Sequence, residues 1–113
     1  MGLLLDTGHA AAAGFDYGRL IQRFGDRIRH IHLKDLRPEV MAQLRRGDAS
    51  FNQGVRAGMF TVPGDGGVDF RPLAQHVRRS DYQGWLIVEA EQDPTAAEPL
   101  STVRRARTFL RNL

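Results

Sequence analysis

The sequence contains no cysteine, and Lys34 is its one lysine. The absence of cysteine excludes disulfide bonds and thiolate metal sites. Any metal ion must therefore be held by histidine, aspartate and glutamate side chains. This donor set suits Mn, Co, Mg, Fe or Zn.

Long hydrophobic runs are also absent. No apolar stretch approaches the roughly 20 residues that a membrane span needs. The chain does not open with the basic stretch and apolar core of a secretory signal. We therefore expect a cytoplasmic protein with no membrane partner.

The bulk composition is that of one globular domain. The 113 residues are 42% hydrophobic and 26% charged, which is an ordinary composition for a small domain with a modest core. The net charge of +3 comes from 16 basic residues, nearly all of them arginine. A basic balance can indicate a nucleic-acid partner. Here the arginines are dispersed among acids and no aromatic residues interleave with them, so we interpret them as solvated helix faces and expect no nucleic-acid partner.

Short apolar runs alternate with helical patterns along the chain. Three runs are typical of strands, and they cover 2–6 (GLLLD), 28–35 (IRHIHLKD) and 84–93 (GWLIVEAEQD). Leu, Ile and Phe at helical spacing predict a helix after Asp16, its expected N-cap. A second helix is expected from Pro38 to the arginines before Gly47. Further helices are predicted within 50–58, 70–82 and 96–113, whereas the glycines and prolines of 60–70 (FTVPGDGGVDF) predict a loop.

This alternation predicts an α/β fold with a parallel sheet and covering helices. Three strands do not close a barrel, which takes eight strands and about 250 residues. A free three-stranded parallel sheet would also leave its edges unpaired. We therefore expect residues 1–113 to be the last portion of a larger barrel, incomplete on its own, or to pair with another chain.

Ionisable residues follow each predicted strand at its C-terminal end, the edge where parallel α/β folds bind ligands. Asp6 and His9 close the first strand. The other two strands end in similar groups, namely His32, Lys34 and Asp35 in the second, and Glu89 and Glu91 in the third. Taken singly, a strand-end aspartate such as Asp6 is more often a helix cap or turn former, and His32 is more often a structural histidine. Glu89 could simply pair with an arginine. Together at one edge they predict an open site for a divalent metal, which would polarise a carbonyl and stabilise an enediolate.

These residues also carry a family resemblance. LLLDTGH, IRHIHLKD, the FTVPGDGGVDF loop and YQGWLIVEAEQD resemble the C-terminal part of the xylose-isomerase-like TIM barrels. More narrowly, HIHLKDLRPEV, SFNQGVRAGMFTVPGDGGVDF and GWLIVEAEQDP are similar to the family of myo-inosose-2 dehydratases. The resemblance covers nearly all of the chain and corresponds to the last three βα units of a TIM (β/α)8 barrel. HLKD is widely shared, and the combination of FTVPGDG with EAEQDP is more specific.

The resemblance implies a metal site held by Asp6, His32 and Glu89, with a further Glu from a strand that precedes these three in the family. Mn or Co is the implied ion, and glutathione is implied by the resemblance alone. The implied reaction is dehydration of 2-keto-myo-inositol (scyllo-inosose), a cyclic polyol ketone, to a trihydroxycyclohexane-1,2-dione in inositol catabolism. The implied partner is that small molecule.

Acid–base chemistry falls to His9 and Lys34 in this interpretation. His9 would contact a hydroxyl or the ketone oxygen, although it could instead only hydrogen-bond its loop. Lys34 could transfer protons if its neighbours lower its pKa towards neutrality, and otherwise it would form a salt bridge with Asp35. The remaining candidate substrate-binding residues are Arg37, Asp65 and Glu91. Asp35 and Arg37 could instead position their segment, and PGDGG lacks the lysine of a phosphate-binding loop.

Three other functions remain open. A sugar isomerase or epimerase on the same scaffold would return the proton instead of expelling hydroxide. A non-catalytic truncated remnant would bind metal weakly or only assemble with partner chains. A homo-oligomer, or pairing with the missing part of the barrel, is a further alternative. A nuclease is disfavoured because FTVPGDG lacks the Asp-x-His arrangement of the nuclease relatives. We expect the isolated 113-residue chain to have little or no activity.

Overall fold

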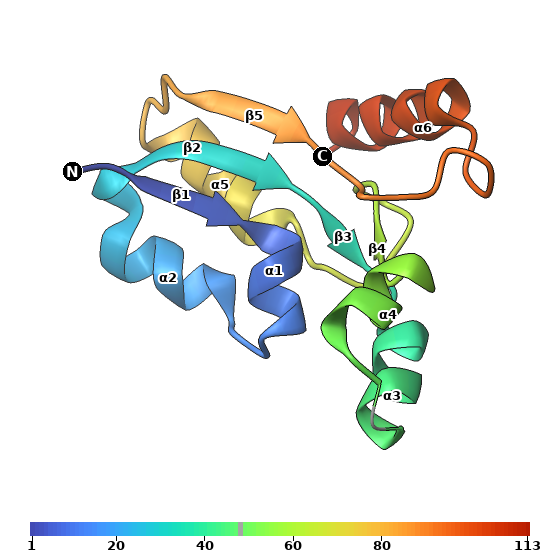
Figure 1. The fold of residues 1–113 in the computed structure, drawn as a ribbon. Helices are drawn as coiled ribbons and strands as arrows, with labels where there is room; N and C mark the ends of the chain where they lie inside the picture. The colour runs from blue at the N-terminus through green and yellow to red at the C-terminus, as the bar shows by residue number, and fades with distance from the viewer. Residues whose placement is uncertain (48) are drawn as a thin grey trace.

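The computed structural model describes residues 1–47 and 49–113. Six helices, five strands and a single 3-10 turn make up this part of the chain (Figure 1). In chain order they are β1 (Leu3–Asp6), α1 (Thr7–Ala12), α2 (Tyr17–Phe24), η1 (Gly25–Arg27), β2 (Ile28–Leu33), β3 (Asp35–Leu36), α3 (Pro38–Arg46), α4 (Phe51–Arg56), β4 (Phe60–Thr61), α5 (Arg71–Arg79), β5 (Trp85–Val88) and α6 (Pro99–Arg111). None of the helices described is both long and apolar enough to cross a membrane.

The main sheet confirms the predicted parallel arrangement. Its three strands lie in the order β1-β2-β5, and both pairings are parallel (Figure 1). Asp6 pairs with His32, and His32 pairs with Ile87. The C-terminal ends of all three strands therefore meet at one edge.

The two faces of this sheet differ. Leu5, Ile31 and Leu33 on one face are buried with Phe70 and Leu73, as helices α2 and α5 pack against that side (Figure 1). Burial of such side chains is the main favourable term in folding.

The other face carries Leu4, His30, Trp85 and Ile87. Leu4, Trp85 and Ile87 are 56%, 74% and 37% exposed, so within the described residues no element covers this side. In a closed barrel this face would be the interior.

Local signals in the sequence place several helix ends correctly. The Asp16 side chain accepts a hydrogen bond from Gly18 N at 2.9 Å and caps α2. Helix α3 begins at Pro38 and ends at Arg46, and the N–H of Gly47 donates to Gln43 O at 3.2 Å.

Two short elements differ from the sequence prediction. The stretch 60–70 is not entirely loop, because β4 at its start pairs antiparallel with β3, placing Thr61 opposite Asp35 and Phe60 opposite Leu36. The second predicted strand accordingly divides at Lys34 into β2 and β3. Helix α1, which the sequence prediction lacked, begins directly after β1 with Asp6 as its N-cap.

Candidate metal centre

The structure brings the three predicted metal ligands together at the C-terminal edge of the sheet. Ligand atoms of Asp6, His32 and Glu89 all lie within 4.8 Å of one another. His32 Nδ1 is 2.8 Å from Glu89 Oε2 and 3.7 Å from Asp6 Oδ2. The register of the strands causes this meeting, because Asp6 pairs with His32 and the N–H of Glu89 continues the ladder by donating to Leu33 O at 3.1 Å.

The donor set fits a divalent ion. Protein nitrogen and oxygen ligands bind such ions at about 2.0–2.2 Å, so two ligands of one ion lie at most ~4.4 Å apart. Small side-chain movements would close the present separations to that range. All three side chains are partly buried, and an imidazole with two carboxylates is a borderline-to-hard donor set suited to Mn, Co or Zn.

Lys34 is the charged centre of the surrounding group of side chains. Its side chain is buried, and its ammonium lies 2.7 Å from Glu91 Oε1, 3.3 Å from Glu89 Oε2 and 3.5 Å from Asp6 Oδ2. We call Asp6, His9, His32, Lys34, Glu89 and Glu91 the rim cluster. Three carboxylates face one ammonium here, so two negative charges remain unbalanced when the imidazoles are neutral.

The environment of Lys34 corrects two expectations. Lys34 donates to Glu91 at 2.7 Å, whereas the Asp35 carboxylate accepts hydrogen bonds from four backbone N–H groups instead. Burial lowers the pKa of Lys34, but the hydrogen bond to Glu91 and the charges of Asp6 and Glu89 outweigh burial and raise its pKa above the ordinary value. The condition for proton abstraction by Lys34, a pKa lowered towards neutrality, is therefore not met. A charged ammonium can still donate hydrogen bonds and polarise a carbonyl.

Asp6 combines the two roles that the sequence left open. Its Oδ1 accepts a hydrogen bond from His9 N at 2.9 Å and so caps α1, while Oδ2 lies 2.9 Å from His9 Nδ1. Burial raises the pKa of Asp6, but the hydrogen bonds from His9 and the charge of Lys34 outweigh it and hold this pKa below the ordinary value. The carboxylate is therefore ionised at neutral pH, as a metal ligand must be.

The contacts of His9 Nδ1 favour one tautomer of the neutral ring. Its Nδ1 lies 2.9 Å from the Asp6 carboxylate and 3.4 Å from the Lys34 ammonium. The shorter contact is with an acceptor, so we assign the proton of neutral His9 to Nδ1. Nε2 then keeps its lone pair and can accept a proton or a hydroxyl hydrogen bond.

Arg37 and Asp65 lie in a neighbouring network. Arg37 donates to Asp65 Oδ2 at 2.7 Å and to Gly58 O at 2.7 Å, and the Thr61 hydroxyl donates to the same Asp65 oxygen at 2.6 Å. Among the described residues neither side chain has a polar contact with the rim cluster. Burial raises the pKa of Asp65, but the hydrogen bonds from Thr61 and Arg37 outweigh it and lower this pKa. Of the predicted substrate-binding residues, His9, Lys34 and Glu91 meet at the rim, and Arg37 and Asp65 pair with each other.

Asp35 confirms the prediction that it positions its segment. Its buried carboxylate accepts four backbone hydrogen bonds, which come from Leu36 N and Val68 N at 2.8 Å, Gly64 N at 3.0 Å and Gly66 N at 3.1 Å. We call this arrangement the loop anchor. The glycine-rich loop thus turns its amides onto a carboxylate of the protein itself.

Three residues near the rim escaped the sequence analysis. The hydroxyl of buried Thr7 donates to Lys34 O at 2.6 Å and accepts from Lys34 N at 3.0 Å, which ties the end of β1 to β2. Phe60 lies beneath the Lys34 ammonium, 4.8 Å from ring centre to Nζ, and Phe51 lies beside His9. The position of Thr7 in DTGH was a usable signal, because it directly follows a strand-end aspartate. The proximity of the two phenylalanines depends on tertiary packing.

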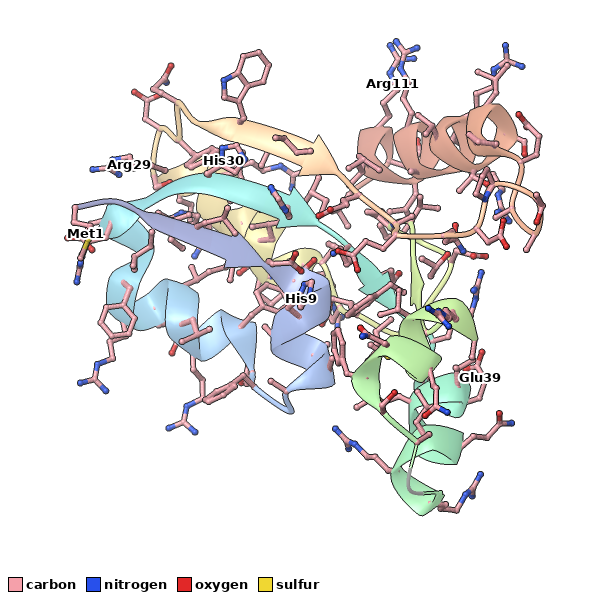
Figure 2. The ribbon with its side chains drawn as sticks, in the orientation of Figure 1. Met1, His9, Arg29, His30, Glu39 and Arg111 are labelled. Carbon is pink, nitrogen blue, oxygen red and sulfur yellow. The ribbon has the colours of Figure 1, made fainter. Side chains whose placement is uncertain are left out.

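The larger hollows of the surface lie elsewhere. One of about 640 Å³ is lined by Arg29, Tyr82 and Trp85, at the N-terminal ends of β2 and β5. No rim residue lines it. The rim cluster lies at the opposite, C-terminal ends of the strands, and Figure 2 shows His9 there, just after β1.

Comparisons with known proteins agree with this geometry. The chain is 44% identical over 109 residues to an inosose dehydratase of Clostridium botulinum, an alignment that covers 96% of this chain and 37% of that protein. It is 47% identical over 111 residues to an inosose dehydratase of Geobacillus kaustophilus, covering 98% and 36%. It is 50% identical over 112 residues to one of Mesomycoplasma hyopneumoniae, covering 98% and 37%. The chain thus spans a little over a third of the length of these curated relatives.

A family profile matches the chain along its full length. The profile is described as Xylose isomerase-like TIM barrel and aligns with residues 1–113. The parallel order of β1, β2 and β5 and the polar edge at their C-terminal ends are the features that such a barrel requires of its strands. The chain belongs to the xylose isomerase-like TIM barrel family.

Proposed function

We propose that this chain provides the C-terminal three βα units of an inosose dehydratase, together with three of its metal ligands. The observation that carries the proposal is the convergence of Asp6, His32 and Glu89 within 4.8 Å at one sheet edge. The names of the relatives support the reaction, and the unbalanced negative charge of the rim cluster supports a divalent cation. We propose Mn or Co as that ion.

When bound, the ion would polarise the ketone of 2-keto-myo-inositol and stabilise the negative charge that develops on its oxygen. Its ligands in this chain are Asp6, His32 and Glu89, with the family's further Glu as the fourth. The resemblance implies glutathione as well, but we assign no residue to it. We keep the cytoplasm as the proposed compartment.

The chain's own residues supply a base for the proton removal that begins a dehydration. A C–H bond beside the ketone breaks. Nε2 of His9 can accept that proton, because the contact of Nδ1–H with Asp6 leaves the lone pair of Nε2 free. The C–O bond to the β-hydroxyl then breaks, and the hydroxyl leaves as water with a proton from an acid. The resulting enol tautomerises to the dione. Lys34 donates hydrogen bonds and positive charge to the oxygen atoms of the substrate, and Glu91 holds its ammonium in place.

The uncovered face of the sheet supports the expectation that the chain works with further barrel strands. Leu4, Trp85 and Ile87 are exposed on it, and β1 and β5 each have one unpaired edge among the described strands. We propose that the further strands complete the same barrel as β1, β2 and β5, and that they belong either to the same polypeptide or to a partner chain. The isolated 113-residue chain should then show little or no dehydration of inosose. Measurable loss of water from inosose in the presence of the purified chain alone would overturn this expectation. The same assay separates dehydration from isomerisation or epimerisation, since only dehydration loses water.

Metal titration tests the site directly. We expect the wild-type chain to bind one equivalent of Co²⁺ with the visible absorption of a protein-bound ion, and Asp6→Ala, His32→Ala and Glu89→Ala each to weaken this binding at least about tenfold. His30→Ala is the matched control, because His30 lies on the same strand and face, with its ring centre 5.1 Å from that of His32. Unchanged affinity in all three ligand variants would show that the site is elsewhere.

A further inference from the structure

An exposed aromatic side chain stands next to the rim cluster. Phe51, the first residue of α4, is 52% exposed, and its ring centre lies 6.0 Å from that of His9 with the planes inclined by 29°. Phe60 packs edge-on against Phe51 at 5.9 Å and lies 4.9 Å from His9. Figure 2 shows His9 just beyond the end of β1, where the polar side chains of the strand ends gather. The aromatic row thus runs from the buried Phe60 to an open phenyl face beside the polar edge.

Helix α4 holds Phe51 in a fixed position. A capping box closes its first turn, with Gln53 N donating to Ser50 Oγ at 3.3 Å and Ser50 N donating to Gln53 Oε1 at 2.6 Å. Gly54 is pressed so closely against Leu44 of α3 and against Met59 that a Cβ there would lie 2.5 Å from Leu44 Cδ1 and 2.8 Å from Met59 Sδ. The exposure of Phe51 is therefore not the result of a loosely attached helix. A rigidly presented phenyl ring in water forgoes the gain of burial, which a ligand covering it would restore.

The proposed substrate has a surface that matches a phenyl ring. A chair cyclohexane whose hydroxyls are all equatorial carries axial C–H bonds on both faces and its oxygen atoms around the edge. Inosose with the ketone in place of the axial hydroxyl of myo-inositol is such a ring. Its edge oxygens suit the carboxylates, imidazoles and ammonium of the rim cluster, and its C–H face suits an aromatic ring.

We propose that Phe51 is the apolar wall of the substrate site and that its phenyl ring takes the C–H face of the cyclic polyol. This inference rests on the proposed function and adds a specificity determinant to it. Phe51 favours rings without an axial hydroxyl on the packed face, because such a hydroxyl would be pressed against the phenyl ring and lose its hydrogen bonds to water.

Saturation-transfer NMR of the 113-residue chain tests this inference. The probe is scyllo-inositol, the non-reacting all-equatorial polyol, with Mg²⁺ present and the protein's aromatic protons irradiated. We expect saturation of the axial C–H protons by the wild type, and binding weaker by roughly three- to tenfold in Phe51→Ala, the range of an aromatic contact. Phe51→Tyr keeps the flat ring and should restore binding. Phe15→Ala is the matched control, since Phe15 is an equally exposed phenylalanine, at 64%, that has no aromatic contact with His9 or Phe60.

Cobalt titration of the same variants separates the two proposals. Weaker polyol binding in Phe51→Ala with unchanged Co²⁺ affinity supports the proposal that Phe51 is the apolar wall of the substrate site. Polyol binding that is equal in Phe51→Ala and wild type but lost in Asp6→Ala overturns the wall and leaves the proposed function standing. A wild-type chain that binds Co²⁺ but transfers no saturation to scyllo-inositol also overturns the wall. If the wild type binds neither probe, both proposals fail together.

Discussion

Lys34 and Asp35 are consecutive, fully buried and oppositely charged, yet their surroundings differ in kind. Lys34 faces three carboxylates, Asp6 at the end of β1 and Glu89 and Glu91 just after β5, and those carboxylates outnumber it. Asp35 faces four backbone N–H groups that satisfy it completely.

This difference distinguishes the rim cluster, a candidate binding site, from the loop anchor, which supports the fold. The backbone amides of the loop anchor are fixed by the fold, so the anchor has one arrangement. Its carboxylate is fully hydrogen-bonded within the protein and needs no bound ion. The rim cluster is held by side chains and keeps an excess of negative charge. A buried polar group with fixed partners stabilises a fold, whereas a cluster with unbalanced charge is poised to bind a cation.

The strongest test of this contrast is Asp35→Ala, for which we expect the largest loss of stability. Removal of the carboxylate leaves several buried N–H groups without an acceptor, at about 1–3 kcal/mol each, and we expect a total loss of about 3–5 kcal/mol. Urea unfolding followed by circular dichroism measures it. Asp26→Ala, at an exposed aspartate, is the control and should change the free energy of unfolding by less than about 0.5 kcal/mol. A loss below about 1 kcal/mol in Asp35→Ala would mean that water replaces the carboxylate and that the anchor is not structural.

Lys34→Met should give a smaller loss, about 2 kcal/mol at pH 7, because the three carboxylates then repel one another without a counter-charge. Because the folded pKa of Lys34 is raised, its stabilisation is complete below the unfolded value of about 10.4 and is lost as the pH rises through the folded pKa. The wild type should therefore lose stability above about pH 10, and Lys34→Met should lack that alkaline component. Thermal unfolding across pH 7–11 measures both effects.

The effect of a metal ion on the melting temperature gives a second test with the same variant. Millimolar Mn²⁺ should raise the melting temperature of Lys34→Met more than that of the wild type, since the ion takes over a larger unbalanced charge. Arg56→Met, at an exposed arginine of α4, controls for the loss of one positive charge. An equal rise in melting temperature in Lys34→Met and in this control would show that the charge of Lys34 does not act on the metal site.

The smallest effect is expected from Asp65→Asn, which removes the partner of Arg37. The folded pKa of Asp65 is lowered, so its stabilisation is present above the unfolded value of about 3.9 and is lost as the pH falls through the folded pKa. The pair is partly exposed, and we expect it to contribute less than about 1 kcal/mol. Wild type and variant should therefore differ at pH 6 and converge towards pH 2 in acid titrations of stability. A difference that persists at pH 2 would indicate a role for Asp65 other than its charge.

The sequence predicted the parts of this molecule that depend on local pattern. The three parallel strands follow from short apolar runs, and the caps at Asp16 and around Pro38 and Gly47 follow from local chemistry. The meeting of Asp6, His32 and Glu89 was also predictable, because parallel strands bring their C-terminal ends to one edge.

Other features depend on contacts between distant segments. Strand β4 is two residues long and exists only through its pairing with β3, so no periodicity marks it. The apolar wall at Phe51 requires α4 to pack beside α1, which neither segment's sequence encodes alone. The alternative in which Lys34 pairs with Asp35 does not hold, because amides of the distant glycine-rich loop occupy the Asp35 carboxylate.

Thr7 has a consequence for how the donor atoms assemble. Its hydroxyl gives and receives a hydrogen bond with the Lys34 peptide, so it acts as one more rung of the ladder just after β1 has ended. A slip of one residue between these strands would turn His32 towards the helices, and this rung opposes that slip at the end where the chemistry lies. Two of the three candidate metal ligands, Asp6 and His32, are thereby held opposite each other by contacts between the first two strands alone.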